Sequence, residues 1–148
     1  MSLWAWALEA YAQEGVAQAC LALQDDHGQN VPFLLWAVWA EGADEAALAE
    51  GASLAAAWDE RAVKPLRQAR RGLKPALAGL DDRGRETLRE DVKAMELQAE
   101  RLLLDGLERL CGGQAGGLPA LAALQAASRA WGVSAPDEAL ARLAGALS

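Results

Sequence analysis

Apolar residues recur along the chain at steps of three and four, the spacing of one face of an α-helix. Polar capping residues and glycines divide this pattern into segments. The pattern predicts helices over 3–13, 16–26 and 31–40, then one that begins at 44 and restarts or kinks at Pro65. It further predicts a basic helix over 65–73 and helices over 84–110, 118–131 and 135–147. We therefore expect an all-α protein in which residues 1–148 form a single-domain irregular bundle of six to seven helices.

The segment VPFLLWAVWA, residues 31–40, is apolar on every side. A helix with this pattern is enclosed by other helices. Asn30 stands where an N-cap is needed, and Pro32 falls in the first turn, where a missing N–H is tolerated. The segment is expected to be the buried central helix of the bundle.

Capping residues predict where several helices begin and end. Ser2 and Asp44 are candidate N-caps, and Gly28 stands at the position of a left-handed C-cap. Near the C-terminus, Gly132 is expected to end one helix. Ser134 is expected to cap the next, with Asp137 at the capping-box position.

A glycine-rich break is expected before the C-terminal helical pair, which spans about 118–147. It consists of Gly112, Gly113, Gly116 and Gly117.

The long segment 84–110 carries apolar or small residues at alternating steps of four and three. They are Leu88, Val92, Met95, Ala99, Leu102, Gly106 and Leu110. This seam can pair with a neighbouring helix or with a second copy of the chain.

Composition supports the helical class and restricts the partners. The chain has no isoleucine, and Thr87 is its only threonine, so residues that favour strands are scarce. The net charge of −7 disfavours nucleic acid and anionic membranes as partners. The N-terminus lacks the basic region of a signal peptide, and Cys20 and Cys111 are expected to be reduced thiols. Together these features predict a cytoplasmic protein.

The first candidate site is the polar segment QDDHGQN, residues 24–30. Gln24 and Asn30 offer amides for binding, while His27 and Asp25 are weak candidates for acid–base catalysis. Adjacent helical residues point about 100° apart and chelate poorly, so we expect no metal here. The structural alternative is that the charged residues end a helix while Gln24 and Asn30 bind backbone groups around Gly28.

The second candidate site is a basic helix over 61–74, a stretch without any acidic residue. Its basic residues are Arg61, Lys64, Arg67, Arg70, Arg71 and Lys74. All but Arg61 fall within a sector of about 120° of one helix.

Three uses compete for this basic face. It can pair with the acids of the long helix, which are Glu86, Glu90, Asp91, Glu96 and Glu100. It can bind a small anionic ligand, since arginine forks match phosphate and carboxylate. It can also bind an acidic protein or an RNA backbone, although one short stripe without interleaved aromatic residues is weak support for RNA.

The tryptophans Trp4, Trp36, Trp39 and Trp58 fall at positions expected to face inward. Packing in the core explains them, and a Trp-lined pocket for a planar or apolar ligand is the alternative. No phosphate-binding glycine loop is present, so no nucleotide cofactor is expected.

Several segments resemble the DUF2390 family of small bacterial proteins of unknown function. The resemblance is carried by CLALQDDHGQNV, by LLWAVWA, by Trp58 with VKPLRQARRGLK, and by ELQAERLLL. It covers about residues 3–104. The family often has Asn where this chain has Pro32. The resemblance implies a helical, cytoplasmic bacterial protein and supplies no activity.

These observations lead to three functional hypotheses. The first is a non-enzymatic binding or interaction protein that uses the basic helix face, 61–74. The second is an enzyme acting on a phosphorylated or carboxylated small molecule. It would grip the anion with Arg67, Arg70 and Arg71 and use His27 or Asp25 for proton transfer. The third is a structural homodimer formed through the 88–110 seam.

Overall fold

A computed structural model describes residues 1–111 and 116–148 of the chain. Its elements are α1 (Leu3–Ala12), α2 (Val16–His27), α3 (Val31–Trp39), α4 (Glu45–Trp58), the π-helical segment η1 (Asp59–Val63), α5 (Lys64–Gly72), α6 (Asp82–Leu110), α7 (Ala120–Trp131) and α8 (Asp137–Ala146). Because α4, η1 and α5 follow one another without a break, the described residues form seven helical segments and no strand. The expected all-α class is confirmed.

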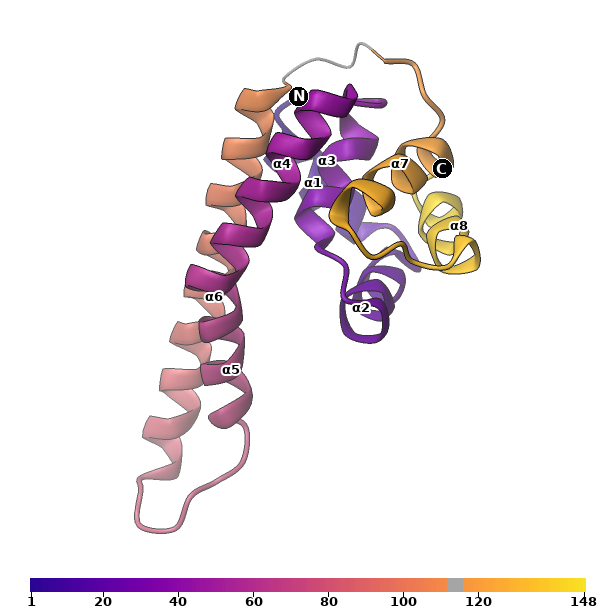
Figure 1. The fold of residues 1–148 in the computed structure, drawn as a ribbon. Coiled ribbons are helices and arrows are strands. Elements are labelled where there is room, and N and C mark those ends of the chain that lie inside the picture. Colours follow the sequence, from indigo (N-terminus) through magenta and orange to yellow (C-terminus); the bar gives the residue numbers. More distant parts are fainter. Residues whose placement is uncertain (112–115) are drawn as a thin grey trace.

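Helix α3 lies at the centre of the fold, as its apolar sequence predicts (Figure 1). Helices α1, α4, α6 and α7 all pack against it. The Asn30 side chain caps the helix by accepting a hydrogen bond from Phe33 N at 3.0 Å. Phe33 and Trp36 are fully buried, and the Phe33 ring lies 5.8 Å from the rings of both Trp36 and Trp131. Burial of each such side chain contributes about 2 kcal/mol to the core.

The four tryptophans expected to face inward divide into two groups. Trp36 and Trp39 are buried in the core, whereas Trp4 and Trp58 are half-buried at its edge. The Trp58 indole N–H donates to Ala99 O at 2.8 Å, which ties the end of α4 to α6.

Most of the predicted caps are confirmed. Ser2 and Asp44 accept hydrogen bonds from the backbone N–H groups three residues later. Gly28 and Gly132 adopt the left-handed conformation that ends a helix, with φ of 62° and 103°. The expectation for Ser134 is wrong, because α8 begins after Pro136 without a side-chain cap. Asp137 instead accepts a hydrogen bond from Gln125.

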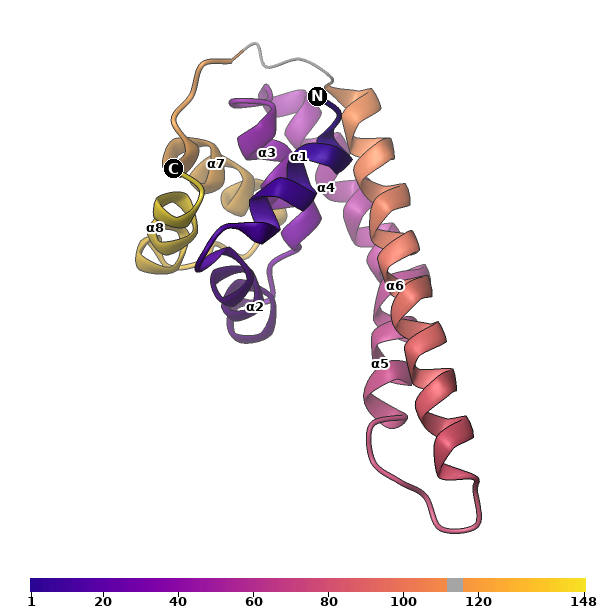
Figure 2. The same cartoon turned by 180° about the vertical axis from the view of Figure 1, so that it is seen from behind.

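Segment α4–η1–α5 runs antiparallel to α6, and the two form a helical hairpin that extends beyond the other helices (Figures 1 and 2). The predicted disturbance at Pro65 takes the form of the π-helical turn η1 directly before it. Proline has no N–H to continue the α-helical hydrogen bonds. The Lys64 N–H bonds to Asp59 O, five residues back. The hairpin thereby carries the basic residues alongside α6.

The seam expected along 88–110 is divided between two faces of α6. Val92 and Ala99 are buried, while Leu88, Met95 and Leu102 are 52%, 53% and 61% exposed. Helix α6 contacts five elements, α1, α3, α4, η1 and α5, so its buried surface is wider than one seam. Pairing with a neighbouring helix therefore explains only part of the pattern.

The C-terminal pair α7 and α8 packs back onto the first half of the chain. Helix α7 contacts α3 and α4, and α8 contacts α2. Of the predicted glycine-rich break, Gly116 and Gly117 lie in the connection before α7, and Gly112 and Gly113 lie outside the described residues. Within 1–111 and 116–148, no helix combines the length and the apolarity needed to cross a bilayer.

Candidate functional site: a polar cavity beside α2, α5 and α6

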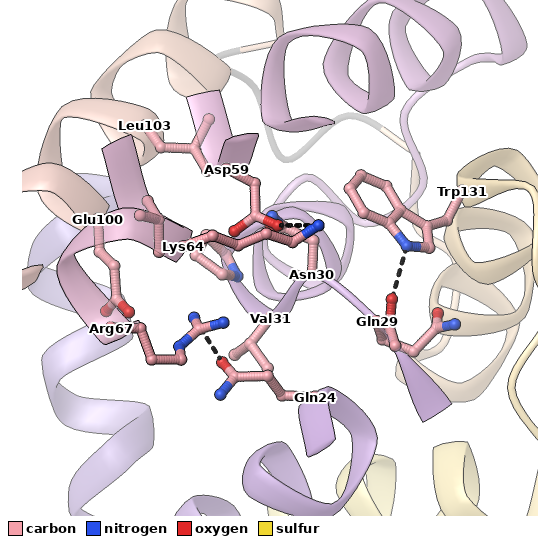
Figure 3. A pocket seen from close by; sticks show the side chains of 13 residues that line it. Gln24, Gln29, Asn30, Val31, Asp59, Lys64, Arg67, Glu100, Leu103 and Trp131 are labelled. Carbon is pink, nitrogen blue, oxygen red and sulfur yellow. Dashed lines mark hydrogen bonds and ion pairs between the residues drawn. The ribbon is translucent and has the colours of Figure 1, made fainter. Parts of the chain in front are cut away.

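A cavity of about 160 Å³ lies where the end of α2 and the start of α3 face the hairpin (Figure 3). Its polar wall consists of Gln24, Gln29, Asn30, Asp59, Lys64, Arg67 and Glu100. Its apolar wall consists of Val31, Pro32, Val63, Leu103 and Trp131. Two charged groups of each sign therefore face one small space.

The cavity brings together residues from both candidate sites of the sequence. The Arg67 Nη2 donates to Gln24 Oε1 at 3.2 Å, although the two residues lie 43 positions apart. The π-helical turn places Arg67 on the inner side of the hairpin, and Gly28 ends α2 so that Gln24 in its last turns faces the hairpin. Gln24 also donates to Asp25. The alternative in which Gln24 binds backbone groups around Gly28 is therefore wrong.

Pairing with α6 accounts for two of the basic residues. Arg70 donates to both carboxylate oxygens of Glu96, at 2.6 and 3.4 Å. The Arg67 Nε lies 3.6 Å from the same carboxylate. Glu96 is buried, and its hydrogen bonds raise the pKa of Arg70. Of the other acids considered, Glu86 and Glu90 bind Arg85 and Lys93 within α6 instead.

The remaining basic residues are more exposed. Lys64 binds Glu60 one turn earlier, and its Nζ lies 3.7 Å from Asp59 Oδ2. Arg71 lies 3.5 Å from Asp25, with both side chains well exposed, so this pair contributes little to stability. Arg61 and Lys74 are exposed and do not line the cavity.

Glu100 lines the cavity, although the sequence did not identify it as a binding or catalytic residue. Its carboxylate has no hydrogen bond or ion pair with any residue in the described ranges, yet it is half-buried and lines the cavity. The pKa of Glu100 is raised to about 7, chiefly by burial and also by the charge of Glu96, while Arg67 and Arg70 lower it and Asp59 adds a smaller increase. Glu100 follows Glu96 by one helical turn, so both acids lie on the same face of α6. This spacing is the sequence feature that could have indicated Glu100.

Neither weak catalytic candidate lines the cavity. His27 lies in the last turn of α2, and its carbonyl accepts a hydrogen bond from the Gln29 side chain. Asp25 is exposed and is held by Gln24 and Arg71.

Gln29 is a second residue missed in the sequence, and its role is structural. It is only 4% exposed. Its amide N–H groups donate to His27 O and Val133 O, and its oxygen accepts from the Ser128 hydroxyl. The Trp131 indole N–H donates to Gly28 O at 2.9 Å beside it (Figure 3). These bonds join the α2–α3 turn to the C-terminal pair.

These features define an all-α protein with a mixed-charge cavity between its central helices and a helical hairpin. The family model described as "Protein of unknown function (DUF2390)" matches residues 2–107, so the chain belongs to the DUF2390 family. This match confirms the resemblance found in the sequence. No curated protein and no solved structure matches the chain. The matched region includes Gln24, Arg67 and Glu100 and ends before α7.

Proposed function

We propose that the chain is a binding protein for a small molecule with an anionic group, and that the cavity beside α2, α5 and α6 is its ligand site. The observation that carries this proposal is that Gln24 and Arg67 line the same cavity and are joined by a hydrogen bond. A planar guanidinium presents paired donors that match a carboxylate or a phosphate. Lys64, on the same wall, supplies a second cation.

The size of the cavity supports a small ligand. Its 160 Å³ corresponds to the volume of about five water molecules. Pockets for drug-sized ligands usually span about 300–1,000 Å³. A short organic acid fits this space better than a nucleotide does.

A ligand in the cavity is better supported than an acidic protein on the basic helix. Arg70 is taken up by the buried Glu96 carboxylate, which Arg67 approaches only through Nε at 3.6 Å, so the helix does not offer its full positive charge to an outside surface. The Arg67 Nη2 faces Gln24 at the cavity instead. An enzyme is less well supported, because His27 and Asp25 do not line the cavity.

The test begins with native mass spectrometry of the chain purified gently from its host, which detects a retained small molecule. Isothermal titration then uses inorganic phosphate and 4-methylpentanoate, a short branched carboxylate, as probes. We expect at least one probe to bind, and Arg67→Met to weaken it by about tenfold or more, the effect of losing about 1.4 kcal/mol. Arg71→Met is the matched control, because it removes an arginine of the same helix that does not line the cavity. Equal weakening by both variants, or no binding of these probes or of any other molecule with an anionic group, would contradict the proposal.

A further inference from the structure

We infer that the ligand of this cavity is a zwitterion, with its acidic group on Arg67 and its ammonium group on Glu100. This inference rests on the proposed function and names the ligand class of the same site. It starts from Glu100, which the anion-binding proposal leaves without a role.

The Glu100 carboxylate faces the cavity without a donor. Within residues 1–111 and 116–148, nothing forms a hydrogen bond or an ion pair with it. The side chain is half-buried, so water solvates the carboxylate only in part, and a donor inside the cavity would stabilise its charged form. Figure 3 shows Glu100 and Arg67 on adjoining parts of the wall, with the Arg67 guanidinium directed toward Gln24. A ligand ammonium group would supply the donor that the protein does not.

The charges on the wall favour a ligand with both signs. Arg67 and Lys64 are opposed by Asp59 and Glu100, so the four formal charges cancel when Glu100 is ionised. A simple anion on Arg67 would be repelled by the two carboxylates, and a simple amine on Glu100 would be repelled by the two cations. A zwitterion pairs both of its charges and avoids either repulsion.

The apolar wall defines the rest of the ligand. Val31, Val63 and Leu103 line the cavity together with Trp131. They provide contacts for a short aliphatic chain but no further polar partner. An amino acid of the size of leucine therefore has the right combination of charges, chain and volume to serve as the probe.

The pH dependence of binding separates a zwitterion from a simple anion. The titratable and charged groups that face Glu100 are Glu96 on α6, Arg67 and Arg70 on α5, Asp59 on η1, Tyr11 on α1 and Cys20 on α2. With its pKa raised to about 7 by burial, Glu100 is partly protonated at neutral pH. An ammonium group needs the ionised carboxylate, so zwitterion affinity rises from pH 6 to pH 8. A simple carboxylate is repelled by that ionised form, so its affinity falls over the same range.

The experiment is isothermal titration of the full chain with leucine, 4-methylpentanoate and 3-methylbutylamine, at pH 6 and pH 8. These probes share one branched chain and differ in whether they carry both charged groups, the acid alone or the amine alone. We expect leucine to bind about tenfold more tightly than either analogue, a difference of about 1.4 kcal/mol, and more tightly at pH 8 than at pH 6.

The variant that tests the role of Glu100 is Glu100→Gln, an isosteric change. It should remove the preference for leucine over 4-methylpentanoate without weakening 4-methylpentanoate. Glu90→Gln, an exposed acid of the same helix, should keep the preference. If 4-methylpentanoate or 3-methylbutylamine binds as tightly as leucine, or the preference survives Glu100→Gln, the zwitterion inference is overturned. If 4-methylpentanoate still binds through Arg67, the proposed function stands. If none of these probes, no phosphate and no other molecule with an anionic group binds, both fail.

Discussion

Ser128 is a small polar residue on which a long-range connection depends. It is 1% exposed, and its hydroxyl donates to Gln29 Oε1 at 2.9 Å while accepting from Ala135 N at 2.7 Å. Both partners are buried as well. Removing the hydroxyl would leave a buried carbonyl oxygen and a buried N–H group without partners.

We therefore expect Ser128→Ala to lower the free energy of unfolding by about 1–3 kcal/mol. Urea denaturation followed by tryptophan fluorescence measures the change. The matched control is Ser134→Ala, which removes the hydroxyl that the sequence assigned as an N-cap and the structure leaves unused. Its effect should stay within about 0.5 kcal/mol. A larger loss for Ser134→Ala than for Ser128→Ala would contradict the observed start of α8.

Glu100 makes stability depend on pH. Its pKa is raised from 4.5 to about 7 in the folded protein, chiefly by burial. Between these values the unfolded chain has released the proton that the folded chain still holds. The stabilising contribution is therefore complete below pH 4.5 and is lost as the pH rises toward 7.

Glu100→Gln should remove this loss of stability at higher pH. At pH 5 the variant and the natural chain should have similar free energies of unfolding, and at pH 8 the variant should be more stable by up to about 3 kcal/mol, at 1.36 kcal/mol per pKa unit. Urea denaturation at the two pH values checks this, with Glu90→Gln as a control for the loss of an exposed charge. A difference between Glu100→Gln and the natural chain that does not change with pH would show that Glu100 titrates normally.

Local residue patterns predict local roles and miss distant partners. Asn30 and Gly28 follow from capping rules that involve only neighbouring positions. Gln24 binds Arg67, 43 positions away, and Gln29 binds Ser128, 99 positions away. The two glutamines are chemically identical, and nothing near them in the sequence indicates which partner each one binds. The role of Glu100 depends in the same way on burial by several separate helices.

Helices α3 and α4 approach each other closely at Gly51. A Cβ atom there would lie 2.6 Å from Trp36 Cζ3 and 3.2 Å from Phe33 Cε1. Both aromatic rings are fully buried, so neither can move without disturbing the core. The glycine thus sets the distance between the two helices.

Gly51→Ala is expected to lower the free energy of unfolding by about 1–3 kcal/mol through overpacking. Gly145→Ala makes the same chemical change in α8, where no atom lies within 4 Å of the new Cβ. It should raise stability by about 0.5–1 kcal/mol, because alanine is the better helix former. Thermal unfolding of both variants and the natural chain checks this: Gly51→Ala should lower the melting temperature and Gly145→Ala should raise it. Equal effects would mean that α3 and α4 do not pack as closely as described.

Periodicity predicts the helices better than it predicts the faces they bury. The sequence predicts one long helix over 84–110, and α6 spans Asp82–Leu110. The seam assigned to it nevertheless includes Leu88, Met95 and Leu102, which are exposed. A helix that passes several partners changes its buried face along its length, and a seam read from the sequence alone assumes one partner. The homodimer proposed for this seam remains a prediction, and sedimentation of the full chain at micromolar concentration tests it.

The whole molecule depends on contacts between its two ends. The family match stops at residue 107, but α7 and α8 cover α2 and α3, and the Trp131 ring packs against Phe33. Gln29 binds Val133 O and Ser128 from within the matched region. The glycine-rich break therefore separates two sequence segments that share one core.

A chain that ends at Cys111 is expected to lose cooperative folding, because removing α7 and α8 would expose the apolar side of α3 and leave Gln29 without its distant partners. Such a fragment should keep helical far-UV circular dichroism, lose its near-UV signal and bind a hydrophobic dye, as loosely packed states do. The full chain with Arg129→Ala, an exposed change on α7, controls for alteration of the C-terminal pair and should unfold cooperatively. If the fragment instead unfolds with the urea midpoint of the full chain, residues 1–111 fold on their own. The cavity would then have to be stable without Trp131, and the prediction of a single domain would be wrong.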